Sequence, residues 1–308
     1  MNTAQAASSA SLVSFWLTAL ALPVALFFLW RADVIRPGSF HRAGVRSLPE
    51  HPWTLWIAGA VLVFLSAPLG GQLALSITGT EFPNAVSREA SAAPRTPEEE
   101  TRAAARRAQD VRAMGVAALG SYAASITTSV ILIRVMRRRL GSERETRWLW
   151  VRASDVPVGL LALLAGAPFV NAVNIASTFL YTVLSGTSIP VVAHSTLDAV
   201  KASPNDPWVW VVAGVAVLAA PIVEEVMYRA LLQTALLKLT GRASLAVAVT
   251  SLIFGLSHVG AVPWYAMPTL MALGAALGVA YERTRSLGVP IVMHTAFNAA
   301  NVILATLV

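Results

Sequence analysis

Two adjacent carboxylates stand at the end of a long apolar run. The run extends from Trp208 to Val223, and Glu224 and Glu225 follow it directly. Ionisable groups at membrane depth cost several kcal/mol and are by default functional candidates. Glu225 and Arg229 are four residues apart, so on a helix they share a face and can form an ion pair. Glu224 points about 100° away and stays free, which suits a general base that acts on water.

Two histidines and an asparagine lie in later apolar segments. His258 follows an apolar run, and His294 and Asn298 are four residues apart on one helix face. Such groups can polarise a water and a peptide carbonyl: His orients or deprotonates the water, and His or Asn donates to the developing oxyanion. Each cluster alone has a structural explanation, an interfacial Glu–Arg pair or a satisfied core His. Convergence of these residues with Glu224 would instead predict a hydrolytic site.

The order and spacing of these clusters resemble a known family. Glu-Glu-x-x-x-Arg at 224–229, Phe-x-x-x-His at 254–258 and His-x-x-x-Asn at 294–298 look like the CPBP family, the CAAX-protease and bacteriocin-processing intramembrane endopeptidases. The stretch 274–287 is similar to the family's Gly-x-x-x-Gly helix and the turn after it. Physically, two glycines at this spacing let a neighbouring helix approach closely. The resemblance covers about residues 207–308.

The resemblance implies a role for each residue. Glu224 would activate the hydrolytic water with help from His258, while His294 and Asn298 would stabilise the oxyanion. The supporting residues would be Glu225 and Arg229. A metal stays open: Glu224, His258 and His294 could ligate zinc, because two His and a carboxylate form a known catalytic set. A glutamate-driven mechanism that requires no cofactor fits the same residues, and we favour it.

Other protease chemistries find no support in the sequence. The chain has no Cys, which excludes a cysteine nucleophile. It contains no His-Glu-x-x-His run, no rhomboid-type Gly-x-Ser-Gly with a downstream His, and no presenilin-type Gly-x-Gly-Asp. We expect no catalytic role for the remaining histidines: His41, His51 and His194.

Three functions remain for the polar clusters. The first is an intramembrane endopeptidase acting on a membrane-associated peptide or protein, which in a bacterial host would not be a prenylated one. The second is a non-catalytic binding or immunity protein, although such a protein gains nothing from burying these groups. The third is a proton-coupled transporter, which would predict inverted repeats in both halves of the chain. The enzyme is the function we expect.

Composition places these residues in a membrane protein. The chain has 56% hydrophobic and 13% charged residues, against about 25% charged in soluble domains. The net charge of +7 comes mainly from Arg beside apolar runs, which fits a membrane face better than a nucleic acid. We therefore expect an integral membrane protein, in contact with membrane lipid and located in the inner membrane of a bacterium, with no nucleic-acid partner.

The apolar runs predict an all-α, polytopic transmembrane helical bundle. A spanning helix needs about 20 apolar residues, and about eight candidates occur: 11–30, 53–77, 114–135, 156–185 (tilted or broken near Pro168), 208–239, 244–259, 264–281 and 289–307. Residues 1–155 form an N-terminal part with a polar insert at about 78–113, in which 97–112 is predicted as a surface helix. Residues 156–308 form the predicted catalytic core.

Arginine placement predicts the orientation. Basic residues are concentrated in four loops, after the first, third, fifth and seventh of the apolar runs, with Arg31, Arg36, Arg42 and Arg46 in the first, seven Arg between 134 and 152, Lys238 and Arg242, then Arg283 and Arg285. These four loops should share the cytoplasmic side, with both termini outside. The polar insert also carries Arg, on the predicted outer side, where acidic residues accompany it.

Overall fold

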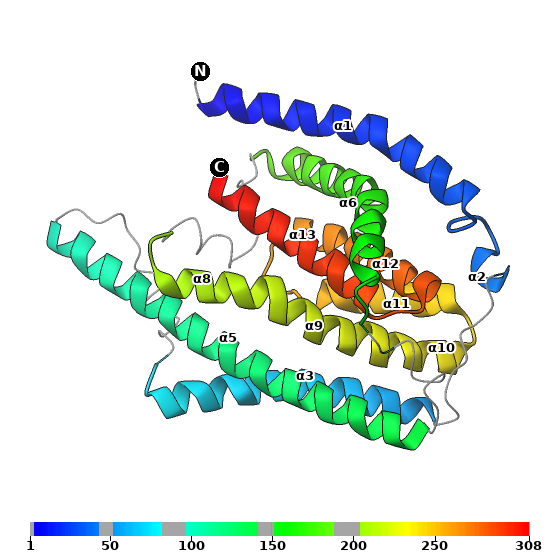
Figure 1. Cartoon of the computed structure of the whole chain (residues 1–308). Coiled ribbons are helices and arrows are strands. Elements are labelled where there is room, and N and C mark those ends of the chain that lie inside the picture. Colours follow the sequence, from blue (N-terminus) through cyan, green and yellow to red (C-terminus); the bar gives the residue numbers. More distant parts are fainter. Residues whose placement is uncertain are drawn as a thin grey trace.

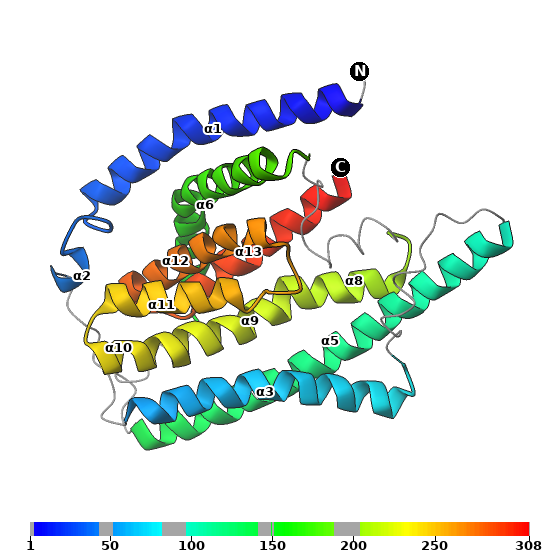
Figure 2. The same cartoon turned by 180° about the vertical axis from the view of Figure 1, so that it is seen from behind.

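The computed structural model is a bundle of helices (Figures 1 and 2). It describes residues 3–42, 52–81, 97–140, 149, 151–187 and 204–307, and no strand occurs among them. The helices are α1 (Thr3–Arg31), α2 (Ser39–Arg42), α3 (Trp53–Thr78), α5 (Pro97–Leu140), α6 (Asp155–Ser185), α8 (Pro207–Gly214), η2 (Val215–Ala219), α9 (Ala220–Glu225), η3 (Val226–Gln233), α10 (Thr234–Thr240), α11 (Ala243–Leu256), η4 (Trp264–Ala266), α12 (Met267–Thr284) and α13 (Gly288–Leu307).

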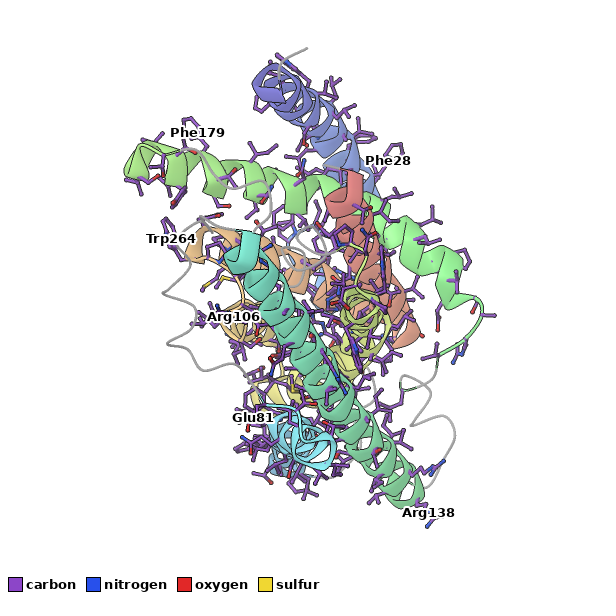
Figure 3. The ribbon with its side chains drawn as sticks, turned by 90° about the vertical axis from the view of Figure 1, so that its left-hand side faces the viewer. Phe28, Glu81, Arg106, Arg138, Phe179 and Trp264 are labelled. Carbon is purple, nitrogen blue, oxygen red and sulfur yellow. The ribbon has the colours of Figure 1, made fainter. Side chains whose placement is uncertain are left out.

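Seven helical segments of the described chain are long and apolar enough to cross a membrane. They are Leu12–Arg31, Trp53–Thr78, Ala105–Met136, Asp155–Ser185, Pro207–Thr240, Trp264–Thr284 and Gly288–Thr306. Large apolar side chains such as Leu69, Ile77 and Phe179 are exposed on them, as expected for lipid-facing surfaces. Phe28 and Phe179 project from the bundle in Figure 3. The predicted all-α polytopic membrane fold is confirmed.

Two predicted elements differ from the observed ones. The sixth predicted span, 244–259, is the shorter α11, which has 14 residues and turns into a loop before His258. The predicted surface helix 97–112 is not a separate element, because α5 continues without a break to Leu140. Residues 98–114 are rich in Ala and contain no Pro or Gly, which allows the helix to run on.

The carboxylate-bearing helix is a single rod with two irregular stretches. Asp206 begins it by accepting a hydrogen bond from the Trp208 amide (2.9 Å), with Pro207 in the first turn. The rod continues through π-helical segments η2 and η3 to its end at Gly241, which adopts φ 65°. Pro221 has no amide proton and its ring crowds the carbonyl four residues earlier, which explains why the ladder widens just before it.

Small residues let the first helical pair pack closely. α3 and α5 run side by side at the base of the bundle in Figures 1 and 2. A Cβ on Gly70 or Gly120 would collide with the backbone of the facing glycine, so both helices need Gly at this crossing. A hydrogen bond joins Ser66 and Ser125 across the same interface at 3.2 Å. Arg106 and Arg138 lie toward opposite ends of α5 in Figure 3.

α6, α12 and α13 form the other side of the bundle, with α11 packed on α12. A Cβ on Gly274 would come within 3.2 Å of the Ser251 Cα, so α11 and α12 are in backbone contact there. α6 contains Pro168 and is bent in Figure 1, as expected for a span broken near that residue.

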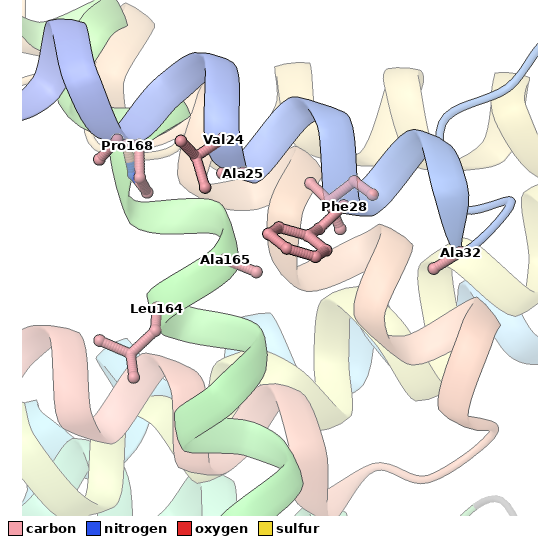
Figure 4. Close-up of a pocket in the computed structure, with 9 residues that line it drawn as sticks. Val24, Ala25, Phe28, Ala32, Leu164, Ala165 and Pro168 are labelled. Carbon is pink, nitrogen blue, oxygen red and sulfur yellow. The ribbon is translucent and has the colours of Figure 1, made fainter.

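α1 lies on the outside and packs on α6. The Asn171 amide donates to the Thr18 hydroxyl at 2.6 Å. Farther along, the two helices leave an apolar pocket of about 470 Å³ between them (Figure 4), lined by Ala21, Val24, Ala25, Phe28, Leu29, Ala32, Leu164, Ala165 and Pro168. None of these residues belongs to the polar clusters.

The described parts of the four basic loops lie at one end of the bundle (Figures 1 and 2). The Arg283 guanidinium donates to the Val34 carbonyl at 2.7 Å, which joins the last basic loop to the first. The Asp155 carboxylate accepts from the Ser286 hydroxyl and the Arg152 amide, both at 2.8 Å, which joins the second basic loop to the last one. This common end agrees with the predicted topology; that it is the cytoplasmic end stays a prediction.

Candidate active site

Glu225 is the centre of a buried polar network. Its Oε2 lies 3.0 Å from the Arg229 Nε and its Oε1 lies 2.9 Å from the His294 Nδ1. Glu225 and Arg229 have no exposed side-chain surface, so the predicted ion pair forms and is fully buried. An ionised carboxylate can only accept hydrogen bonds. The contact therefore assigns a proton to the His294 Nδ1 and directs the Nε2 to the opposite side of the ring.

Arg229 reaches this network from within the aromatic core. Its guanidinium carbon lies 5.2 Å from the Phe254 ring centroid and 5.9 Å from that of Tyr228. Its Nη1 and Nη2 are buried and have no hydrogen-bond acceptor among the described residues. The aromatic faces therefore supply the stabilisation of the cation on that side, and the pairing with Glu225 supplies the rest.

Glu224 is the accessible carboxylate of the pair. Its side chain keeps 19% of its surface exposed, and its Oε2 lies 3.9 Å from the His294 Nε2. That distance is too long for a direct hydrogen bond, and it suits a water that bonds to both atoms. The expectation that Glu224 stays outside the Glu225–Arg229 pair agrees with this geometry.

His258 lies in the loop that follows α11. Its Nδ1 is 2.8 Å from the Phe254 carbonyl, which can only accept, so Nδ1 carries the proton and Nε2 is an acceptor. The Phe254 ring contacts both imidazoles, with centroid distances of 5.0 Å to His258 and 5.7 Å to His294. The structure thus brings the two histidines to one aromatic side chain.

Asn298 joins α13 to the carboxylate-bearing rod. Its Nδ2 donates to the Ala216 carbonyl at 2.8 Å. Ala216 lies in η2, where the regular α-helical ladder is interrupted, and its carbonyl can accept a side-chain donor. Within the part of the chain that the structure describes, the second amide proton and the Oδ1 of Asn298 have no such partner, so they are available to a bound group.

The three residues considered as zinc ligands are not gathered as a ligand set. Glu224 and His294 approach each other, but no group of three or more His, Cys, Asp or Glu side chains within the described ranges is arranged to hold a metal ion. We therefore derive no step through a metal. His41 has no described side chain, and His51 and His194 lie outside the described residues.

Two features of the site were not foreseen from the sequence. The Tyr228 hydroxyl donates to the Ser257 Oγ at 2.7 Å, and the Ala216 carbonyl binds Asn298. The bond from Tyr228 to Ser257 had a signal in the sequence, because Tyr228 is four residues after Glu224 and Ser257 directly precedes His258. The bond from Asn298 to the Ala216 carbonyl depends on an irregular hydrogen-bond register in the helix, which in the sequence only Pro221 indicated.

Fold and site define an integral membrane helical protein with a buried Glu–His–Arg network among its C-terminal spans. Residues 206–300 match the family model described as "Type II CAAX prenyl endopeptidase Rce1-like". The family resemblance inferred from the sequence is thus confirmed over this part of the chain. The match supports an intramembrane endopeptidase in general terms. No curated protein and no solved structure shows a significant match to the chain.

The matched residues contain every member of the candidate site. They lie within the predicted core 156–308, and the division of the chain at residue 155 stays a prediction. The roles of Glu224, His258, His294 and Asn298 also stay predictions, because the match does not identify catalytic residues.

Proposed function

We propose that this protein hydrolyses a peptide bond in a membrane-associated peptide or protein, with Glu224 as the general base. One observation carries the proposal. A partly exposed carboxylate lies 3.9 Å from the free nitrogen of a histidine whose other nitrogen is held at 2.9 Å by the fully buried Glu225. A fixed imidazole beside an accessible carboxylate is a pre-organised place for one water.

The proposed reaction begins with that water. Glu224 takes a proton from it, and the water oxygen bonds to the carbonyl carbon of the substrate. The carbonyl oxygen becomes an oxyanion. His294, whose Nε2 would take a second proton from solvent before the substrate binds, and the Asn298 amide proton that Ala216 does not accept would stabilise it. Glu224 then gives its proton to the leaving nitrogen as the carbon–nitrogen bond breaks. His258 would help to orient the water through its Nε2.

The proposed setting follows from the surrounding surface. The site lies among helices with exposed apolar side chains, so a substrate would approach within the membrane or at its surface. We propose the inner membrane of a bacterium as the location and a bacterial peptide or membrane protein as the substrate. A prenylated peptide, the substrate named in the family description, is the substrate with which an unprenylated one would be compared.

The decisive test is cleavage by purified protein in detergent and in proteoliposomes. Fluorogenic membrane-anchored peptides, prenylated and unprenylated, would be compared for wild type and Glu224→Gln. We expect the substitution to lower kcat by at least about 10²-fold with little change in KM, because it removes the base and keeps the shape. The matched control is Glu81→Gln, which makes the same change at an exposed carboxylate.

Two results would contradict the proposal. A wild-type kcat for Glu224→Gln would show that Glu224 is not the general base. Wild-type protein that cleaves none of these peptides, yet binds one of them, would favour the non-catalytic binding protein. Metal dependence is measured separately, by adding a chelator to the active protein. The cleavage rate stays the same if the mechanism needs no metal, and it falls if the mechanism needs zinc.

A further inference from the structure

One hydrogen bond connects the helix of the acidic residues to the loop of His258. The Tyr228 hydroxyl donates to the Ser257 Oγ at 2.7 Å, and the Ser257 hydroxyl donates to the Phe254 carbonyl at 2.8 Å. The same carbonyl accepts from the His258 Nδ1 at 2.8 Å. Both lone pairs of this one oxygen are therefore used, one by Ser257 and one by His258.

The Phe254 carbonyl is available because α11 ends there. At a helix terminus the last carbonyls have no partner within the helix. The His258 amide bonds to the Gly255 carbonyl at 3.2 Å, and the Ser257 amide bonds to the Ile253 carbonyl at 2.9 Å. Side chains therefore satisfy the carbonyl between them, and the position of the His258 ring depends on how that carbonyl is shared.

Ser257 could bond in a different way. Its Oγ lies 3.4 Å from the His258 Nδ1, so a rotated hydroxyl would compete for that nitrogen. A hydroxyl that donates to Nδ1 would require the other tautomer, in which the proton sits on Nε2. The proton from Tyr228 occupies a lone pair of Oγ and fixes the direction of the Ser257 hydroxyl.

We propose that Tyr228 and Ser257 are positioning residues for His258, which keep the His258 Nε2 free as an acceptor for the water of the proposed reaction. Tyr228 is four residues after Glu224, and Ser257 directly precedes His258. Their hydrogen bond therefore fixes the distance between the two segments that carry the base and the imidazole. The inference rests on the proposed function, because it assigns a task to the same site.

The ring of Tyr228 allows a clean test, because it packs independently of its hydroxyl. It stands edge-on to the Phe254 ring at a centroid distance of 5.2 Å and is 4% exposed. Tyr228→Phe keeps this packing and removes the donor alone. We expect kcat to fall about tenfold, the effect of one hydrogen bond on the transition state, with KM within about twofold.

The test also needs variants of Ser257. Ser257→Ala should lower kcat as much as Tyr228→Phe, and Ser257→Thr, which keeps a hydroxyl, should restore most of it. Because both residues act along one path, the double variant should be no worse than either single one. The matched control is Tyr181→Phe, which removes a hydroxyl from the aromatic contact with Tyr265 (4.4 Å) and should keep wild-type kcat.

A spectroscopic measurement separates this inference from the proposed function. Nitrogen-15 spectra of histidine-labelled protein distinguish the two tautomers, and the His258 signals are assigned by their loss in His258→Gln. We expect the Nδ1-protonated form in wild type and a mixture in Tyr228→Phe. An unchanged tautomer together with unchanged kcat would overturn the inference. If wild type cleaves no peptide, the proposed function fails and the spectra still decide on the positioning role.

Discussion

Glu225 is placed to support the candidate site from behind and not to meet a substrate. Its carboxylate is fully buried, with Arg229 on one oxygen and His294 on the other. A buried charge costs several kcal/mol of desolvation, which its partners must offset. Its task is comparable to that of the outer carboxylates that orient histidine ligands at metal sites, which fix both the tautomer and the ring direction.

Removal of one partner from this network should therefore be costly. Arg229→Leu leaves the Glu225 charge without its cation, and we expect a loss of about 3–5 kcal/mol in the free energy of unfolding. Thermal unfolding of purified protein in detergent measures it. Arg138→Leu, at an exposed position on α5, is the control and should leave the midpoint unchanged.

A double variant checks the reason. Glu225→Gln with Arg229→Leu removes both charges and should be more stable than Arg229→Leu alone, because no unpaired buried charge remains. A double variant that is less stable than the single one would mean that packing, and not the charge, holds this region together.

The sequence predicted part of this network. The Glu225–Arg229 pair follows from helical spacing, because residues four apart share a face whatever the rest of the fold does. The contact between Glu225 and His294 joins residues 69 positions apart, so no local pattern contains it. The link from Tyr228 to Ser257 crosses 29 positions for the same reason.

At the scale of elements, the contact between α11 and α12 determines where His258 can lie. A Cβ on Gly274 would come within 3.2 Å of the Ser251 Cα and the Phe254 Cδ1. The first of these is backbone, which cannot rotate away. A larger residue must therefore push α11, together with Phe254, away from α12.

Gly274→Leu should consequently damage both stability and activity. We expect about 1–3 kcal/mol of destabilisation from overpacking, and a fall in kcat that exceeds the fall in folded protein. Gly214→Leu is the matched control, because a Cβ built there meets nothing within 4 Å apart from its own stretch of helix. Equal behaviour of the two variants in thermal unfolding and peptide cleavage would show that α11 does not need this close contact.

Helix positions were more predictable than helix details. The fourth predicted span, 156–185, agrees with α6 within one residue at its start. The reason is that an acidic residue such as Asp155 favours the first turn of a helix, and a glycine such as Gly186 favours its end. The sixth was predicted too long, since apolar residues continue past the end of α11 to Val259. The π-helical segments η2 and η3 could not be predicted, because hydrogen-bond register depends on what packs around the helix.

At the scale of the whole molecule, the common end of the four basic loops predicts the orientation in the membrane. Basic loops stay on the cytoplasmic side. In Figure 1, α6 and α11 run away from that side, whereas α5 ends and α11 begins near it. Ser185 is the last residue of α6 and Val259 follows α11, while Arg138 is in the last turn of α5 and Arg242 directly precedes α11. The natural chain has no Cys, so single cysteines can be labelled without background.

We expect Ser185→Cys and Val259→Cys to react with a membrane-impermeant maleimide in intact bacterial cells. Arg138→Cys and Arg242→Cys should react after lysis, and the unsubstituted protein is the blank. All four positions are exposed in the structure. The reverse pattern would place the basic loops outside and overturn the predicted topology.

The shortness of α11 has a consequence for the lipid around it. Fourteen residues rise about 21 Å, less than the hydrocarbon thickness of about 30 Å. A helix that is too short for its bilayer is accommodated by local thinning of the membrane or by polar groups that enter it. His258 follows the end of this helix, so we expect the headgroup region and its water to be drawn toward the histidine. The hydrophobic mismatch would thereby give the proposed hydrolytic site a supply of water within the membrane.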